Sequence, residues 1–169
     1  MSEQADVIAF LSDPSNLDGA TEVERIDTHC SIVFLAGPRA YKLKRAIRLP
    51  YLDYETPEKR RRMCESELAL NRRTAPEIYE RVAAVTREAD GRLRLDGKGQ
   101  ALDWIVVMKR FAEDGVFDHM AEAGRLDAPV MERLADEIAR FHANIEIHRE
   151  AGGAAALREV FDTNLEAFR

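Results

Sequence analysis

Cysteine is scarce in this chain, and its scarcity limits the kinds of site that we expect. Only Cys30 and Cys64 are present, and their separation matches no metal-binding spacing. We predict that both are reduced and structural in a cytoplasmic protein, and we expect no metal site. No run approaches about 18 consecutive apolar residues, so no membrane-spanning helix is expected. Residues 1–4 are polar and acidic, unlike the basic start of a signal peptide.

A surplus of basic charge is also missing. The 31 acidic residues outnumber the 25 lysines and arginines, and the net charge is −6. This balance argues against nucleic acid as the main partner. The basic cluster Lys59–Arg62 has no interleaved aromatic residues, so we interpret it as the solvated face of a helix.

The sequence does contain the composition and patterning of a globular α+β protein. Its 169 residues, 46% hydrophobic and 33% charged, suit one domain or one and a fraction. Alternating and β-branched runs predict five strands, at 22–26, 31–35, 39–45, 81–87 and 102–109, and the short spacings of the first three fit an antiparallel meander. Helices are predicted at 5–12, 57–73, 115–123, 129–147 and 154–168. The chain then divides into an N-terminal helix and loop (1–19), a sheet with one helix (20–111) and a helical segment (112–169).

Lys42, on the third predicted strand, and Glu67, on the helix that follows, form the most informative pair of residues. In a helix with about 100° per residue, Met63, Glu67 and Leu70 fall on one apolar face, whereas Glu65 points away from it. A carboxylate buried on such a face is costly unless it is paired. One interpretation is that a lysine of the neighbouring strand pairs with Glu67. The other is that Glu67 lies at the edge of the apolar face and reaches water.

Strand alternation places Ala40, Lys42 and Lys44 on one face of the sheet. A strand lysine held by a helix glutamate is how kinase-like folds bind the phosphates of ATP. In that pattern a small residue precedes the lysine by two positions, where adenine must fit. Ala40 satisfies this rule for Lys42, whereas Lys42 would place a charge against adenine if Lys44 were the phosphate ligand. We therefore predict that Lys42 binds phosphate, and the alternative is that both lysines are solvated.

Two stretches carry a family resemblance, SIVFLAGPRAYKLKRAIRLPYLDYETPEKRRRMCESELALNRRTAPEIY and MERLADEIARFHA. They resemble the N-terminal part of bacterial aminoglycoside-phosphotransferase-like proteins, in particular the bifunctional aminoglycoside phosphotransferase/ATP-binding type. The resemblance extends over nearly the whole chain, up to REVFDTNLEAFR. It implies a protein-kinase-like fold, with an N-lobe of five antiparallel strands and one helix followed by the first helices of a C-lobe. It also implies ATP-dependent phosphoryl transfer to a small molecule, with Glu67 as the helix partner of the phosphate-binding Lys42.

Further nucleotide contacts follow from the same resemblance. The remaining predicted ATP-binding residues are Thr28, His29, Ser31, Met108, Lys109 and Phe111. The first three lie in the turn between the first two strands, where hydroxyl and backbone N–H groups would cover the phosphates although the turn is not glycine-rich. The last three end the fifth strand. There the methionine would line the back of the adenine pocket, and the backbones of the lysine and the phenylalanine would bond the adenine edge.

Two parts of the phosphotransferase machinery are not found in the sequence, namely a His-x-Asp catalytic loop and a metal-binding Asp. We therefore expect the ATP-binding portion of an enzyme, inactive by itself, with no catalytic residue and with Mg²⁺ held only by a missing C-lobe. The alternatives are a non-catalytic nucleotide-binding or regulatory module and a protein-interaction domain. The small-molecule acceptor is not indicated. Self-association is also expected, because C-lobe helices would leave apolar side chains uncovered, among them Val130, Leu134, Phe141, Val160 and Phe161.

Overall fold

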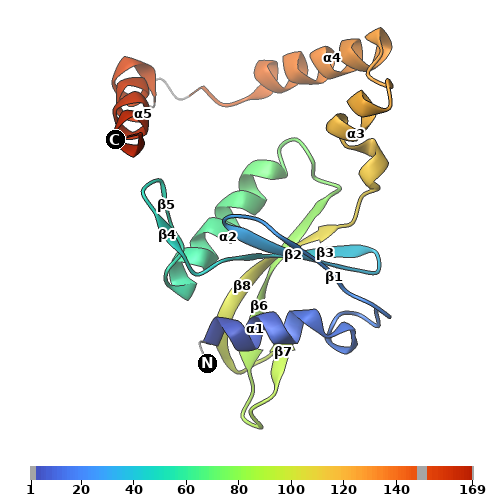
Figure 1. The fold of residues 1–169 in the computed structure, drawn as a ribbon, viewed down its shortest axis with the longest axis vertical. Helices are drawn as coiled ribbons and strands as arrows, with labels where there is room; N and C mark the ends of the chain where they lie inside the picture. Colours follow the sequence, from blue (N-terminus) through green and yellow to red (C-terminus); the bar gives the residue numbers. More distant parts are fainter. Residues whose placement is uncertain (1–2, 148–151, 169) are drawn as a thin grey trace. The chain divides into compact units, whose positions relative to one another are not determined.

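The computed structural model describes residues 3–147 and 152–168 of the chain. The chain divides into two compact units, Met1–Ala112 and Glu113–Arg169. The first unit is an antiparallel sheet with a helix on each face, and the second unit is helical (Figure 1). The predicted α+β class is confirmed.

Six strands form the sheet of the first unit, in the order β1-β2-β3-β8-β6-β7, and every neighbouring pair is antiparallel. They are β1 Glu24–Asp27, β2 Ser31–Ala36, β3 Arg39–Lys44, β6 Tyr79–Arg87, β7 Leu93–Leu95 and β8 Gln100–Lys109. Five of them correspond to predicted strands. The sixth, β7, follows Gly91 and was not predicted as a strand, because three residues are too few to show alternation.

The helix α1 (Glu3–Ser12) covers one face of this sheet (Figure 1). Val7 and Leu11 are fully buried in the same hydrophobic cluster as Tyr41 and Leu43 of β3. A short helix, η1 (Pro14–Asn16), follows α1. The N-terminal helix therefore belongs to the core of the sheet, since its apolar side chains are buried together with those of the strands.

The helix α2 (Pro57–Asn71) packs across β8 and β6 on the opposite face of the sheet (Figure 1). It begins as its sequence predicts: the hydroxyl of Thr56 accepts a hydrogen bond from the Lys59 N–H at 3.3 Å, and Pro57 occupies the first turn. A small hairpin that was not predicted separates β3 from α2 and consists of β4 (Arg48–Leu49) and β5 (Leu52–Asp53). Strands of two residues leave no pattern that sequence reasoning can detect.

The inner face of α2 is polar, which differs from the prediction. Its buried residues are Arg60 and Cys64, whereas Met63 and Leu70 are 41% and 59% exposed. The expectation that Met63, Glu67 and Leu70 share an apolar inner face is therefore wrong. The interpretation of the whole basic cluster as solvated is also wrong, because Arg60 is buried. This helix docks through side chains that form hydrogen bonds, and an apolar pattern does not reveal such a face.

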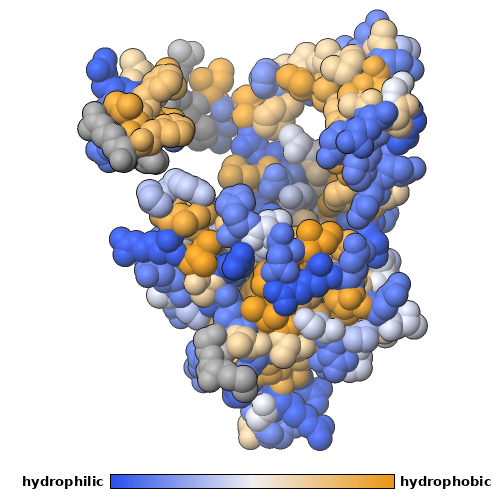
Figure 2. All heavy atoms as spheres, in the orientation of Figure 1, coloured by the Kyte–Doolittle hydropathy of each residue, from blue (hydrophilic) through white to orange (hydrophobic). Residues whose placement is uncertain are grey.

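The second unit comprises η2 (Glu113–Gly115), α3 (Phe117–Glu122), α4 (Ala128–Asn144) and α5 (Gly153–Ala167). No residue of α4 is buried. Val160 and Phe161 of α5 are 56% and 65% exposed, which confirms their predicted exposure, and apolar side chains are visible on the surface of α5 in Figure 2. Val130, Leu134 and Phe141 of α4 are half-buried. Among the described residues, no helix has both the length and the apolar character needed to cross a bilayer.

Candidate functional site

Lys42, Lys44 and Glu67 meet on the α2 face of the sheet and form a hydrogen-bonded triad. The Nζ of Lys42 donates to Oε1 of Glu67 at 2.8 Å, and the Nζ of Lys44 donates to Oε2 at 2.6 Å. Glu65 is exposed and pairs with Arg61 instead. The predicted Lys42–Glu67 ion pair is confirmed. The choice of Lys42 over Lys44 as the partner of Glu67 is corrected, because strand alternation brings both lysines to the same carboxylate.

The members of this triad differ in burial. The side chains of Lys42, Lys44 and Glu67 are 29%, 5% and 13% exposed. Lys44 also lies over the ring of Tyr54, with 5.1 Å between its Nζ and the ring centroid. Lys44 is therefore an interior cation with fixed partners, and Lys42 is the member that a molecule in solution can reach.

The two lysines keep the carboxylate of Glu67 ionised. Burial by itself raises the pKa of a carboxyl group, but hydrogen bonds from Lys42 and Lys44 outweigh burial and lower the pKa of Glu67. Burial also disfavours the charged form of Lys44, yet its hydrogen bond to Glu67 raises the pKa of Lys44 above the ordinary value. Two ammonium groups and one carboxylate leave the triad with a net charge of +1 (+2 − 1). An anion bound at Lys42 would neutralise that charge.

A row of mainly apolar side chains crosses the sheet beside the triad. Leu35, Ala40, Met108 and Tyr79 are successive partners across β2, β3, β8 and β6. Ala40 precedes Lys42 by two positions on β3, so the two side chains share a face. Leu35 and Ala40 are buried, while Met108 and Tyr79 are half-buried. Two predicted adenine-site residues, Ala40 and Met108, are thus direct cross-strand partners next to Lys42.

Most backbone N–H groups at the end of β8 already donate to other residues of the first unit. The Lys109 N–H donates to the Ile78 carbonyl and the Arg110 N–H donates to the Pro38 carbonyl, both at 2.8 Å. The Lys109 N–H therefore already has a partner in the sheet, and a bond from the backbone of Lys109 to adenine stays a prediction. The Phe111 N–H donates to no residue in the described part of the chain, and the Phe111 side chain is 56% exposed. Phe111 thus retains a backbone donor for a ligand.

The turn between β1 and β2 is closed by its own hydrogen bonds. The hydroxyl of Thr28 donates to the Ser31 carbonyl at 2.9 Å and accepts from the Ser31 N–H at 3.0 Å. Ser31 is also buried. These bonds occupy the Thr28 hydroxyl and the Ser31 N–H, and the role of both residues toward phosphates stays a prediction. His29 is exposed. Sequence reasoning missed Arg45, whose guanidinium donates to the Thr28 carbonyl at 3.0 Å and places a cation at this turn.

A second buried ion pair joins α2 to β8. The Nε of Arg60 donates to Oδ1 of Asp103 at 2.7 Å, and the two side chains are 4% and 0% exposed. Arg60 also donates to the carbonyls of Tyr54 and Glu55, and Asp103 accepts from the Trp104 N–H. Sequence reasoning missed this pair because its members are 43 positions apart. The available signal was an aspartate within an otherwise apolar strand.

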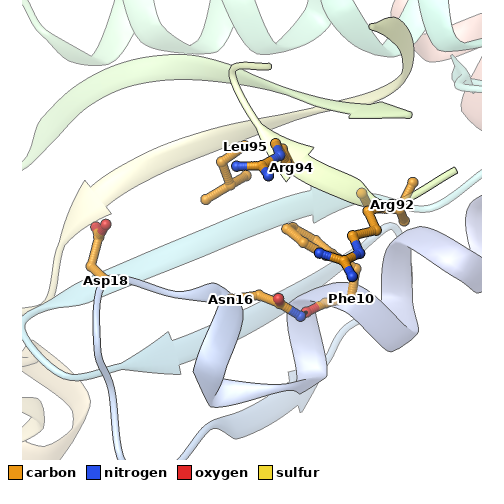
Figure 3. A pocket seen from close by; sticks show the side chains of 7 residues that line it. Phe10, Asn16, Asp18, Arg92, Arg94 and Leu95 are labelled. Carbon is orange, nitrogen blue, oxygen red and sulfur yellow. Dashed lines mark hydrogen bonds between the residues drawn. The ribbon is translucent and has the colours of Figure 1, made fainter. Parts of the chain in front are cut away.

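A cavity of about 410 Å³ lies away from the triad. It is lined by residues that follow α1 or belong to the segment of β7, together with Phe10: Asn16, Asp18, Arg92, Leu93, Arg94 and Leu95. Figure 3 shows Arg92, Phe10 and Asn16 at one end of this cavity and Asp18 at the other. Leu93 and Leu95 pack against the hydrophobic cluster on the α1 face, so the cavity belongs to the face opposite Lys42. Within residues 3–147 and 152–168, no group of three or more His, Cys, Asp or Glu side chains is placed to hold a metal ion.

Comparisons with known proteins identify relatives without assigning a role. The chain is similar to a protein of Mycobacterium bovis and to proteins of two strains of Mycobacterium tuberculosis, each named only as an uncharacterized protein. Each is 30% identical over 146 residues, which is 85% of this chain and 28% of the relative. The chain therefore spans less than a third of the length of the curated relatives that it matches. No protein-family model and no solved structure matches the chain.

Proposed function

We propose that this chain is the ATP-binding portion of an ATP-dependent small-molecule phosphotransferase, with a sheet and helix equivalent to a protein-kinase-like N-lobe. One observation carries the proposal: a strand lysine, Lys42, is paired at 2.8 Å with a helix glutamate, Glu67, on the face where α2 packs. In kinase-like folds this pair holds the lysine against the α- and β-phosphates of ATP. The position of Ala40, two residues before Lys42, agrees with the same arrangement.

The residues present fit the chemistry of a nucleotide. The triad has a net positive charge, and Lys42 is its most exposed member. A phosphate group in solution can therefore reach Lys42 and balance that charge. The row containing Ala40 and Met108 offers an apolar surface for a base, and the Phe111 N–H offers a hydrogen-bond donor. Bound ATP would supply the phosphoryl group, while Glu67 and Lys44 would hold Lys42 in place. We propose that Mg²⁺ and the catalytic base come from residues outside this chain, because phosphoryl transfer needs both.

Binding of ATP to the chain itself tests the proposal most directly. Isothermal titration with ATP should give a weak but saturable signal. Lys42→Met should weaken that binding by about 10- to 100-fold, because a hydrogen bond to a charged group contributes on the order of 1.5–3 kcal/mol. The matched control is Lys98→Met, which removes the same charge from an exposed position between β7 and β8. Its effect should stay within about twofold, since exposed distant charges are screened by salt.

The outcome separates the proposal from its rivals. Loss of binding in Lys42→Met but not in Lys98→Met supports a phosphate-binding lysine. Equal affinity in both variants and the wild type would remove Lys42 from the site. ATP consumption by a longer protein that contains this segment distinguishes an enzyme from a nucleotide-binding module, because a module binds ATP without turnover. Abolition of that turnover by Lys42→Met is expected for the enzyme.

A further inference from the structure

The side chain of Gln4, on α1, makes three hydrogen bonds to the part of the molecule that carries the triad. Its Nε2 donates to the Lys44 carbonyl at 3.1 Å and to Oδ2 of Asp103 at 2.8 Å. Its Oε1 accepts from the Ala46 N–H at 2.7 Å. The orientation of the amide is unambiguous, because the nitrogen faces two acceptors and the oxygen faces a donor.

These bonds connect three elements through one amide group. The Lys44 carbonyl and the Ala46 N–H flank Arg45, so Gln4 fixes the end of β3 at the residue whose ammonium group binds Glu67. Asp103 lies on β8, and its other carboxylate oxygen binds Arg60 of α2. A helix on one face of the sheet is thereby connected to the helix on the other face.

The connection reaches Glu67 along α2. Arg60 lies seven residues, or about two turns, before Glu67 on the same helix (67 − 60 = 7). A shift of α2 at Arg60 therefore moves the Glu67 carboxylate relative to Lys42 and Lys44. Because the contacts at Arg60 and Glu67 are charge pairs with directional hydrogen bonds, small displacements weaken both.

We propose that Gln4 is a positioning residue for the nucleotide site, which it serves by holding the end of β3 and, through Asp103 and Arg60, the docked position of α2. The nucleotide part of this inference rests on the function proposed above. Gln4 does not belong to the triad, and it acts on Lys42 only through other groups. An intact N-terminal helix is accordingly required for the Lys42–Glu67 pair to be assembled.

Cys64 provides a readout of α2 docking that does not depend on nucleotide. It is fully buried on the inner face of α2, and its thiol donates to the Trp104 carbonyl at 3.6 Å. A thiol reagent reaches such a group only when the helix moves away from the sheet. Cys30→Ser is introduced in every protein so that Cys64 is the one thiol measured, since the chain has two cysteines.

The test compares two substitutions on the same helix. Gln4→Met keeps the length of the side chain and removes the three hydrogen bonds. Asp6→Asn is the matched control, because it weakens a different polar link of α1, the bond of 2.8 Å from Arg87 to Asp6, without touching the Gln4 contacts. Gln4→Met should raise the rate of Cys64 labelling by at least about threefold over the control at equal global stability. It should also weaken ATP binding by about fivefold or more, the lower end of typical coupling between sites.

A second variant guards against a non-specific effect of Gln4→Met. Gln4→Glu keeps an acceptor for the Ala46 N–H but removes the donor and faces Asp103 with a like charge, so it should expose Cys64 at least as much. If both variants label Cys64 no faster than Asp6→Asn, the positioning role is refuted. If Cys64 labelling rises but the wild type itself does not bind ATP, the link from Gln4 to α2 is supported and the proposed function fails. If ATP binds with unchanged affinity to a variant whose Cys64 is exposed, Gln4 does not position the nucleotide site.

Discussion

Replacement of Glu67 by alanine offers the sharpest test of the triad. The substitution leaves two ammonium groups facing each other, and Lys44 has a side chain that is only 5% exposed. Lys42 is 29% exposed and can turn to water, so the unpaired charge of Lys44 accounts for most of the cost. The ring of Tyr54, 5.1 Å from the Lys44 Nζ, offsets a part of it.

The expected loss is about 3 kcal/mol of unfolding free energy at neutral pH, because removing one partner of a buried ion pair typically costs about 3–5 kcal/mol. The matched control is Glu65→Ala on the same helix. Glu65 forms an exposed pair with Arg61 at a spacing of four residues, and such a pair contributes less than about 0.5 kcal/mol. Comparison of the two variants separates the buried charge from the helix propensity of alanine.

The free energy of unfolding should also depend on pH differently in the wild type and in Glu67→Ala. In the wild type the lowered pKa of Glu67 contributes stability above its ordinary value of 4.5, and this contribution is lost as pH falls through the folded pKa. The raised pKa of Lys44 contributes stability below its ordinary value of 10.5, and this contribution is lost as pH rises through the folded pKa. In Glu67→Ala, burial without a partner lowers the pKa of Lys44. The folded variant then binds fewer protons than the unfolded chain, and its stability rises with pH.

Urea unfolding followed by circular dichroism, at neutral pH and at about two pH units above it, measures both effects. The gap between wild type and Glu67→Ala should be about 3 kcal/mol at neutral pH and should narrow at the higher pH. Glu65→Ala should follow the wild type at both values. A loss below about 1 kcal/mol, or a gap independent of pH, would show that Lys44 is not the buried cation described above.

Two further predictions concern the second ion pair and the helical unit. Asp103→Ala should lower the free energy of unfolding by about 3–5 kcal/mol, because Arg60, which is 3% exposed, loses the carboxylate that pairs with it. A loss below about 1 kcal/mol in urea unfolding would contradict this. The exposed apolar side chains of α5 should promote self-association, so sedimentation velocity should detect oligomers that depend on protein concentration. Phe161 is 65% exposed, and Phe161→Asp should reduce these oligomers. A monomer at all concentrations tested would contradict the prediction.

Much of the sheet could be predicted from the sequence, because its longer strands have period-two patterns and β-branched residues. The Lys42–Glu67 pair could also be predicted, since strand alternation restricts where Lys42 can point, although the apolar helix face on which Glu67 was expected to lie is not the buried one. The participation of Lys44 was within reach of the same argument, because alternation places it beside Lys42 on β3. The prediction named Lys42 alone because a small residue must lie two positions before the lysine that binds phosphate. That rule does not restrict which lysine pairs with Glu67.

The polar face of α2 could not be predicted in this way. Hydropathy assigns Arg60 to solvent and Met63 to the interior, whereas the structure buries Arg60 and leaves Met63 41% exposed. The decisive partner, Asp103, lies on a strand 43 positions away, and Gln4 reaches it from 99 positions away. Local periodicity contains no information about partners at such separations, and a buried charge is stable only when they are present.

The polar docking of α2 has a consequence for how this helix can move. An interface made of aliphatic side chains holds a helix through many weak contacts, none of which has a preferred direction. The inner face of α2 instead forms hydrogen bonds through Arg60, Cys64 and Glu67. A shift of the helix by one turn moves each of these groups by about 5.4 Å, which is longer than a hydrogen bond. A displacement of that size weakens all three together. We therefore expect α2 to populate two states, one packed against the sheet and one detached from it, with few intermediates. The hydrogen-bonded triad at Lys42 is then either fully formed or lost.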